Sequence, residues 1–333
     1  MRTYPIPPYP NGWFRVAFSD EVPVNGVKPV KYFGRELVIF RGEDRQARVM
    51  DAHCPHLGAH LGMGGKVVDN TIKCPYHGWR FDGCGTCVEV PFSTKIPGRA
   101  RLNKWPVVER NGVIFAHYHA EGLAPDFEIP DIPEYNSGQF AHGRTGRMIR
   151  AHIQETQENM IDTGHFNFIH HGFRECPRIT QWEEDGRHFR VQLSALSEYG
   201  PFVSPANFSF DVYGVGLQVV HVEAKMSFVI VFVITPIDEE SMDFRFMVLF
   251  KKSRFRIFST IMQRVLMNRV MAEIAEDIPV WENKTFPAQP VLAANDRDLI
   301  RFRKWNHQFY TFPKPQAEHA ESIHSESRSL TQL

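Results

Sequence analysis

The chain has 333 residues, which is enough for about two domains. Lys and Arg number 38, and Asp and Glu also number 38, so the balanced charge argues against a nucleic-acid-binding protein. Hydrophobic residues make up 43% of the chain and there are only 5 cysteines, a composition that favours a packed globular protein over a disulfide scaffold. No apolar run reaches the roughly 18 residues of a membrane span, and the first residues lack the apolar core of a secretory signal. We therefore expect a soluble, cytoplasmic protein.

The first 122 residues are predicted to form a small antiparallel β domain. Gly and Pro separate short β-rich runs there, such as residues 36–41 and 113–118. Residues 123–146 begin with a Pro- and acid-rich stretch and are interpreted as a linker.

Residues 147–316 are predicted to form a second domain with both helices and strands. Residues 150–169 contain few glycines and favour helix, and a long run of helix-forming residues is closed by Pro279. Between them, apolar residues alternate with polar ones, which gives each strand one buried face. The alternation is seen at 189–193, 208–212 and 244–250, and the apolar run 228–234 is interpreted as a buried strand. The fold class is therefore α+β, and the polar residues 317–333 are expected to be disordered.

The strongest motif pairs one cysteine with one histidine on each of two short segments. Cys54 and His56 are followed by seventeen residues and then by Cys74 and His77. Two such loops are typical of a Rieske [2Fe–2S] centre, in which one iron takes two thiolates and the other takes two imidazoles. The same residue types also suit tetrahedral zinc, but zinc fingers group Cys with Cys and His with His. The spacing therefore indicates an iron–sulfur cluster.

Cys84 and Cys87 form a further Cys-x-x-Cys sequence. This spacing is compatible with a third metal site or a redox pair, but no second pair accompanies it. We interpret it as part of a hairpin turn.

A second candidate metal site lies at His165 and His170. Histidines five residues apart diverge on a regular helix, so they can hold one ion only if the helix widens or ends between them. Without such a distortion they are ordinary surface or core residues. A carboxylate would have to come from later in the chain, where Glu273, Glu276 and Asp277 are the candidates.

These motifs resemble the Rieske-type non-haem iron oxygenases, and the resemblance extends from Pro10 to Tyr310. It is closest to the sterol-oxidising branch, namely the Neverland-type cholesterol 7-desaturases and the bacterial 3-ketosteroid 9α-hydroxylases. The residues that carry it are Asp51–His60, Ile153–Asn159 and Val280–Lys284. The resemblance implies a Rieske domain followed by a helix-grip, START-like catalytic domain.

The order Asn-x-x-Asp-x-x-His-x₄-His, from Asn159 through Asp162 to His165 and His170, resembles the family's mononuclear iron motif. The resemblance makes Asp277 the third ligand and gives Asn159 and Asp162 catalytic roles. In similar oxygenases the residue at Asp162 reaches a cluster histidine of the next subunit, here His77, within a homotrimer. We also expect its carboxylate to accept a hydrogen bond from His165.

The resemblance implies an enzyme that uses O₂ to desaturate or hydroxylate an apolar substrate, most simply a sterol, as in cholesterol 7-desaturation. A hydroxylase or demethylase of another apolar or aromatic substrate is one alternative, and an electron carrier with a lipid-binding domain is another. The 27 phenylalanines suit an apolar cavity but also an ordinary core. Because neither a nucleotide-binding glycine motif nor a ferredoxin-like Cys₄ run is present, electrons must come from a separate NAD(P)H-dependent reductase or ferredoxin.

Overall fold

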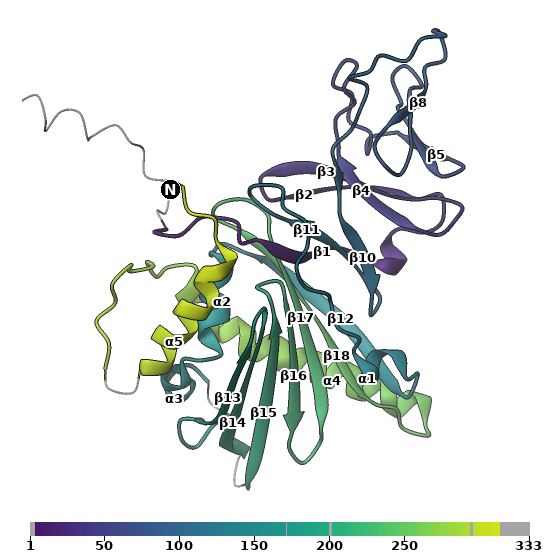
Figure 1. Ribbon diagram of the computed structural model, residues 1–333. Coiled ribbons are helices and arrows are strands. Elements are labelled where there is room, and N and C mark those ends of the chain that lie inside the picture. Colours follow the sequence, from purple (N-terminus) through teal and green to yellow (C-terminus); the bar gives the residue numbers. More distant parts are fainter. Residues whose placement is uncertain (1–3, 171, 200–201, 294–295, 314–333) are drawn as a thin grey trace, which may run out of the picture.

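The computed structural model describes residues 4–170, 172–199, 202–293 and 296–313. The tail expected to be disordered, 317–333, lies outside the described residues. Within them, three small antiparallel sheets come from the first part of the chain and one large antiparallel sheet from the second (Figure 1). The predicted α+β class is confirmed. None of the described helices is long and apolar enough to cross a membrane.

The small sheets build the amino-terminal domain. The expected runs 36–41 and 113–118 are strands β3 and β11. In spatial order, the first sheet contains β1 (Gly12–Phe18), β11 (Val113–Tyr118) and β10 (Val107–Arg110). The second contains β2 (Val27–Tyr32), β3 (Arg35–Arg41), β4 (Ala47–Asp51) and β9 (Lys104–Trp105). The third contains β5 (Lys66–Val68), β6 (Thr71–Lys73), β7 (Arg80–Phe81) and β8 (Cys87–Glu89). The third sheet lies at the end of the domain farthest from the large sheet (Figure 1).

The large sheet has the order β12-β18-β17-β16-β15-β14-β13, with antiparallel neighbours throughout. Its strands are β12 (Phe140–Ile149), β13 (Arg178–Asp185), β14 (His188–Tyr199), β15 (Phe202–Tyr213), β16 (Leu217–Glu223), β17 (Phe228–Pro236) and β18 (Met242–Lys251). The helices and 3₁₀ turns are η1 (Ser19–Glu21), α1 (Pro133–Asn136), α2 (Ile153–Asn159), η2 (Thr163–His165), α3 (Phe166–Ile169), α4 (Arg256–Trp281), α5 (Arg297–Asn306) and η3 (His307–Phe309).

The predicted alternation of apolar residues matches the burial of β14, whereas Phe208 and Phe210 of β15 are only half-buried and β18 is buried on both faces. On β14, Phe189, Val191 and Leu193 are at most 1% exposed. The predicted strand at 228–234 is the buried β17. One hydrophobic cluster runs from Phe14 in the amino-terminal domain to Phe244 in the large sheet, so the two domains share a core.

The segment interpreted as a linker, 123–146, contains α1 and the first part of β12. One expectation about the end of a helix needs correction. Helix α4 does not end at Pro279 but continues to Trp281. Pro279 lacks only its own N–H bond in the last turn, and the amide of Glu282 still donates to the carbonyl of Ile278 at 2.9 Å.

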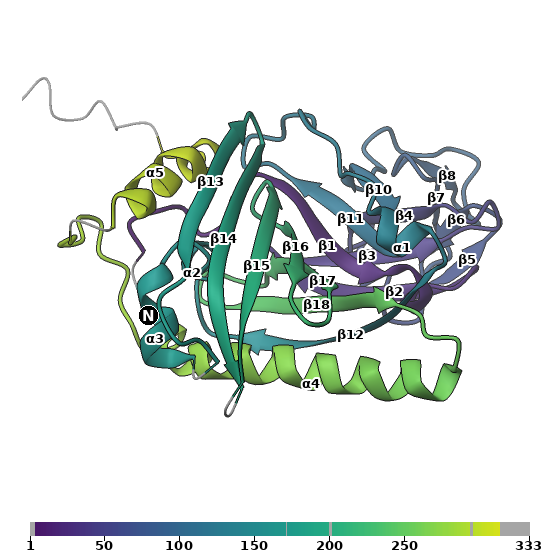
Figure 2. The same ribbon diagram turned by 90° about the horizontal axis from the view of Figure 1, so that it is seen from below.

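The long helix α4 lies along β12 and β18 (Figure 2). The side chains of Gln263 and Met267 in α4 lie directly over Gly143 of β12, in space that a Cβ atom would otherwise occupy. This packing fixes the residues of α4 relative to the sheet, which matters for the site described below.

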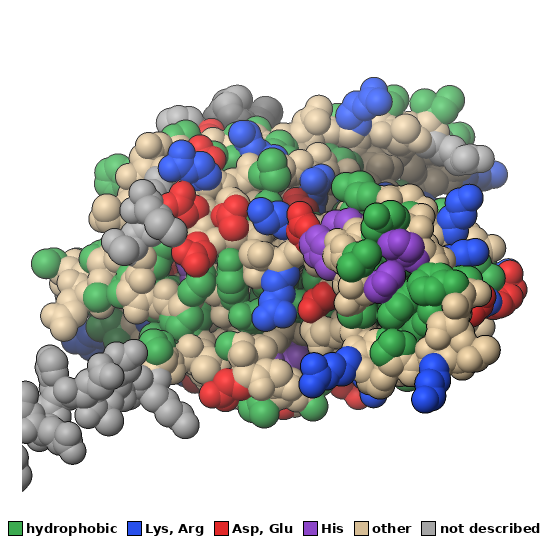
Figure 3. Space-filling model, turned by 90° about the horizontal axis from the view of Figure 1, so that it is seen from above, with side chains coloured by type: hydrophobic (Ala, Val, Ile, Leu, Met, Phe, Trp, Pro, Cys, Tyr) green, Lys and Arg blue, Asp and Glu red, His purple; other side chains and the backbone are tan. Residues whose placement is uncertain are grey.

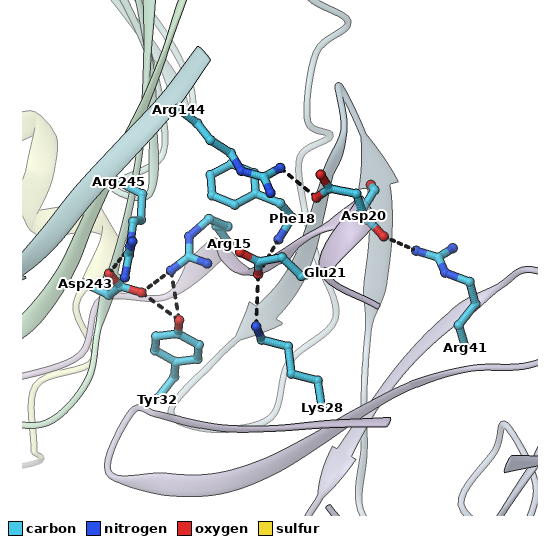
Figure 4. A network of polar contacts seen from close by, with 11 residues as sticks. Arg15, Phe18, Asp20, Glu21, Lys28, Tyr32, Arg41, Arg144, Asp243 and Arg245 are labelled. Carbon is cyan, nitrogen blue, oxygen red and sulfur yellow. Dashed lines mark hydrogen bonds and ion pairs between the residues drawn. The ribbon is translucent and has the colours of Figure 1, made fainter. Parts of the chain in front are cut away.

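A buried polar network joins the two domains (Figure 4). Arg15 of β1 donates to the Tyr32 hydroxyl at 2.8 Å and pairs with Asp243 of β18, and Tyr32 donates to Asp243 at 2.9 Å. Burial raises the pKa of Tyr32 to about 12, so the hydroxyl keeps the proton that it donates. Arg15, Tyr32 and Asp243 therefore each have a partner within the network, although the buried Nε atom of Arg15 has none among the described residues, and the network links the two domains.

Candidate metal centres

Residues 54–59 and 74–79 form two loops of the same backbone shape. The amide of Gly58 donates to the carbonyl of Cys54 at 2.9 Å, and the amide of Gly78 donates to that of Cys74 at 3.1 Å. The φ angles of these glycines are 75° and 77°, a left-handed conformation that residues with a Cβ atom rarely adopt. The spacing in the sequence thus produces two matched turns, each carrying one cysteine and one histidine.

The four predicted cluster residues converge between these loops. Cys54 and Cys74 are free thiols and are buried, 2% and 3% exposed. The rings of His56 and His77 lie 4.6 Å apart between centroids. Among the described residues, the buried Nδ1 atom of His56 has no hydrogen-bond partner. A metal bond would satisfy that atom, so the residues fit a cluster with thiolates on its inner side and imidazoles on its outer side.

The pKa of the Cys54 thiol agrees with a site that holds a metal. Burial first, and then the neighbouring Cys74 thiol, raises the pKa of Cys54 to about 11. A thiol with this pKa stays protonated at neutral pH unless a metal displaces the proton.

Large apolar side chains surround the two histidines at the surface. Leu57, Met63, Tyr76 and Phe92 are 63–66% exposed. Seen from above, hydrophobic side chains gather around histidines on the amino-terminal domain (Figure 3). The histidine end of this centre is therefore accessible to another protein surface.

Cys84 lies in the turn between β7 and β8, and Cys87 begins β8 and packs in the same hydrophobic cluster as Cys54 and Cys74. Cys84 is exposed, and the buried Cys87 donates to the carbonyl of Glu89 at 3.4 Å. Both thiols are free, and the turn that carries Cys84 connects the paired strands β7 and β8, as a hairpin does.

The second centre brings together His165, His170 and Asp277, whose candidate ligand atoms all lie within 4.8 Å of one another. The Asp277 Oδ1 atom is 3.9 Å from His165 Nε2 and 3.5 Å from His170 Nε2. That oxygen is buried and, among the described residues, has no hydrogen-bond partner. Two imidazoles and a carboxylate suit a mononuclear iron with open positions, so these residues fit the metal.

The two histidines converge because the helical segment ends between them. His165 closes the 3₁₀ turn η2, the single turn α3 follows, and His170 is already extended at φ −96° and ψ 120°. Of the two distortions that would let histidines five residues apart share one ion, the structure has the second: the helix ends before His170 instead of widening. Asp277 comes from α4, far away in the sequence but held against the sheet by the packing at Gly143.

Burial governs the charge of this centre. It raises the pKa of Asp277 to about 6 and lowers the pKa of His165 to about 4. Burial thus favours a protonated Asp277, whereas a bound cation favours the charged carboxylate. A histidine that binds a metal must also be neutral, which the lowered pKa of His165 provides. The site therefore suits a metal better than a proton.

Asn159, at the end of α2, lies between two of the candidate ligands. Its Nδ2 atom is 3.1 Å from His165 Nε2 and 3.2 Å from Asp277 Oδ2, and Trp281 donates to its Oδ1 at 3.4 Å. The amide therefore contacts a histidine and a carboxylate that belong to different helical segments.

The two other carboxylates considered for the site lie on the opposite side of His170. Its Nδ1 atom is 3.0 Å from Glu276 Oε2 and 3.4 Å from Glu273 Oε2. The Nε2 atom of the same ring faces Asp277. Glu276 can accept a hydrogen bond from the N–H at Nδ1, which keeps the proton on that nitrogen and leaves the lone pair of Nε2 free for a metal. Sequence reasoning weighed Glu276 only as a ligand and missed this orienting position.

The hydrogen bond expected from His165 to the Asp162 carboxylate is not formed. His165 Nδ1 instead bonds to the main-chain carbonyl of Asp162, while the nearest carboxylate oxygen is 3.9 Å away. The Asp162 side chain accepts from the amide of Gly164 at 3.1 Å, because it caps the 3₁₀ turn. It remains about half exposed, at 52%.

A largely apolar cavity of about 480 Å³ opens beside His165, His170 and Asp277. Its volume falls in the range of about 300–1,000 Å³ usual for small-molecule sites. The part of its wall that comes from the large sheet includes Phe208, Phe210, Val220, Ile230 and Phe232. Part of the phenylalanine content thus lines a cavity, whereas Phe189 and Phe246 fill the core.

Comparisons with known proteins agree with both centres. The Rieske [2Fe-2S] domain family matches residues 12–106, and the 3-ketosteroid 9alpha-hydroxylase C-terminal domain family matches residues 116–310. Cholesterol 7-desaturase nvd 1 of Ciona intestinalis is 31% identical over 93% of this chain and 71% of that protein. Cholesterol 7-desaturase nvd of Drosophila melanogaster is 33% identical over 92% and 76%. The oxygenase component of 3-ketosteroid-9-alpha-monooxygenase from Rhodococcus rhodochrous is 27% identical over 91% and 84%.

Solved structures share the fold. Pseudomonas putida NdmA with caffeine has a TM-score of 0.73 at 24% identity, with 88% of this chain and 89% of that chain covered. Dicamba monooxygenase bound to dicamba has a TM-score of 0.73 at 19% identity, with 90% and 96% covered.

Proposed function

This chain belongs to the Rieske non-haem iron oxygenases whose catalytic domain is of the 3-ketosteroid 9α-hydroxylase type, and on that premise we propose that it oxidises a sterol or steroid. The enzyme class is oxidoreductase, with a Rieske [2Fe–2S] cluster and a mononuclear non-haem iron as cofactors. The observation that carries the substrate proposal is the apolar cavity of about 480 Å³ that opens beside His165, His170 and Asp277.

Each site residue has a proposed role. Cys54, His56, Cys74 and His77 hold the cluster, and His165, His170 and Asp277 hold the mononuclear iron, which supplies O₂ activation when bound. Asn159 donates to Asp277 Oδ2 at 3.2 Å and so orients this carboxylate, whereas its contact of 3.1 Å with His165 Nε2 would give way to the metal, which takes the lone pair of that nitrogen. The phenylalanine-rich wall keeps water away from the bound substrate and holds it against the histidines.

Hydroxylation and desaturation share the same inputs. Either reaction consumes one O₂, two electrons and two protons; hydroxylation yields an alcohol and one water, whereas desaturation yields an alkene and two waters. Cholesterol 7-desaturation is the version that the Neverland-type relatives favour. The electrons come from a separate NAD(P)H-dependent reductase or ferredoxin.

We propose a homotrimer as the working assembly. The exposed apolar rim around His56 and His77 and the half-exposed Asp162 carboxylate are the surfaces that would meet across a subunit boundary. In a closed ring each cluster would then deliver electrons to the next subunit's iron.

Product analysis tests the proposed reaction. The purified protein, a ferredoxin with its reductase, NADPH and O₂ are incubated with cholesterol or a 3-ketosteroid, and the products are identified by mass spectrometry. His170→Ala, which keeps the cluster but lacks an iron ligand, serves as the control. Sterol oxidation by the wild type alone supports the proposal; a fully iron-loaded enzyme that oxidises no sterol or steroid contradicts it.

The electron-carrier alternative differs in its metal content. An enzyme with both centres holds about three irons per two acid-labile sulfides, whereas a carrier with the cluster alone holds about two. Elemental analysis therefore separates the two functions independently of the substrate.

A further inference from the structure

The first half of helix α4 exposes an unusual number of large apolar side chains. We call them the α4 face. Its members, with their exposed fractions, are Phe255 (71%), Ile257 (77%), Phe258 (54%), Ile261 (55%) and Val265 (52%). Residues 258, 261 and 265 are spaced so that they share one side of the helix, while Leu266 and Val270 turn toward the sheet and are buried. The helix therefore has two apolar sides, and the sheet covers only one of them.

The same segment carries a local positive charge in a chain that is neutral as a whole. No Asp or Glu occurs between residues 251 and 272, whereas Lys and Arg recur at positions 251, 252, 254, 256, 264 and 269. Of these, Lys251, Lys252, Arg254, Arg264 and Arg269 are exposed, and Arg269 is paired with Glu273. A helix with exposed apolar residues and basic neighbours is typical of a segment that lies on an anionic membrane surface.

The α4 face leads directly to the mouth of the cavity. Val265 belongs both to the face and to the cavity wall. The loop after β16 supplies the exposed Ala224, Lys225 and Met226 to the same wall. Because α4 runs along the outside of the large sheet (Figure 2), this half of the helix is open to a flat surface. The exposed apolar face and the cavity wall therefore meet at Val265.

We infer that the α4 face docks on a lipid bilayer with anionic headgroups and that the substrate enters the cavity from the bilayer. The inference rests on the proposed apolar substrate. A two-fold contact with a second copy of this chain would bring the same cations together, without any acidic residue between positions 251 and 272 to offset them, and a contact within the proposed ring is tested below by light scattering.

Vesicle binding tests the docking without any catalysis. The iron-loaded protein is sedimented with phosphatidylcholine vesicles, with or without about one third phosphatidylserine. We expect at least about tenfold stronger binding to the anionic vesicles, and loss of that difference in high salt. The variant Ile257→Asp/Phe258→Asp should bind at least about tenfold more weakly than the wild type. The matched control Leu123→Asp/Ile300→Asp alters residues that are 58% and 43% exposed away from this face, and it should bind like the wild type.

Substrate delivery separates this inference from the proposed function. With sterol supplied in anionic vesicles, the Ile257→Asp/Phe258→Asp variant should turn over slowly, whereas with sterol supplied on cyclodextrin it should match the wild type. Absence of turnover by the wild type on cyclodextrin would count against the proposed function, while the vesicle-binding result would still decide the docking.

Three outcomes overturn the docking: a wild type that ignores anionic vesicles, a variant that binds them as well as the wild type, or a variant that binds weakly only because its assembly has dissociated. Light scattering on both proteins reports the last case, which would make the α4 face a contact between subunits.

Discussion

The two metal centres assemble their ligands in opposite ways. The four cluster residues come from two short loops between positions 54 and 77, and their histidines lie near the surface within an apolar rim. The second centre takes His165 and His170 from one helical segment and Asp277 from another, and it is enclosed beside a cavity. Electron transfer requires close approach of a partner, whereas oxidation of an apolar substrate requires the exclusion of water. The difference in exposure follows from these two tasks.

The largest effect is expected at the enclosed centre. Asp277→Ala removes one of three ligands, and neither Glu273 nor Glu276 can replace it because both face the other nitrogen of His170. Mononuclear iron affinity should fall by more than about 100-fold and turnover should be lost, while the visible absorption of the cluster stays intact. Iron analysis together with absorption spectroscopy checks this. If Asp277→Ala retains iron and activity whereas Glu276→Ala loses both, the carboxylate has been wrongly assigned.

The two centres also differed in how far the sequence predicted them. Cys54, His56, Cys74 and His77 could be grouped by spacing because each loop is a local turn with its own glycine. For the second centre, spacing left three carboxylates open, and the choice of Asp277 came from family resemblance. The choice depends on the rotation of α4 against the sheet, which is fixed by long-range packing such as the contact of Gly143 with Gln263.

The same limit explains the details that sequence reasoning missed. It predicted that the helix must be distorted or end between His165 and His170, but not that Asp162 would use its carbonyl for His165 and its carboxylate for the turn. Nor did spacing predict that Pro279 would lie inside a helix. Side-chain choices between two nearby partners depend on distances of a few tenths of an ångström, which no residue pattern encodes.

Asp162 provides a test of the connection between the centres. Asp162→Asn keeps a side-chain oxygen that can cap η2 but removes the charge that we expect to face the neighbouring subunit's cluster. Both irons should load and the cluster should still be reducible, yet oxidation of the pre-reduced cluster by O₂ and substrate should slow by about 10- to 100-fold. Single-turnover absorption measurements follow this step. A near-normal rate, or a wild type that is fully active as a monomer, would refute the bridge.

Within the enclosed centre the two histidines are oriented differently: His165 by the main-chain carbonyl of Asp162 and His170 by the carboxylate of Glu276. Variants of Glu276 test what the carboxylate adds. Glu276→Ala removes the acceptor 3.0 Å from His170 Nδ1 and should weaken mononuclear metal binding by about tenfold. Glu276→Gln retains an acceptor and should recover most of the affinity. Titration of the metal-free protein with Co²⁺ gives the dissociation constants.

The matched control for Glu276 is Glu273→Gln. Glu273 is 3.4 Å from the same nitrogen but is also paired with Arg269, so its replacement should change the affinity less. Equal losses in the two variants would assign the effect to the total negative charge rather than to the hydrogen bond.

The smallest effect is expected next to the exposed centre, where Cys84 and Cys87 offer two further thiols. The Cys84→Ser/Cys87→Ser double variant should leave the visible absorption and the iron-to-sulfide ratio of the cluster unchanged. Cys84 is exposed on the β7–β8 turn, and Cys87 already uses its thiol to donate to the carbonyl of Glu89, a bond that a serine hydroxyl can also make. The paired variant Cys54→Ser should destroy the cluster in the same assay, which shows that the measurement can detect a lost ligand. Loss of absorption in the Cys84→Ser/Cys87→Ser protein, with circular dichroism unchanged, would mean that the two matched loops do not by themselves hold the cluster.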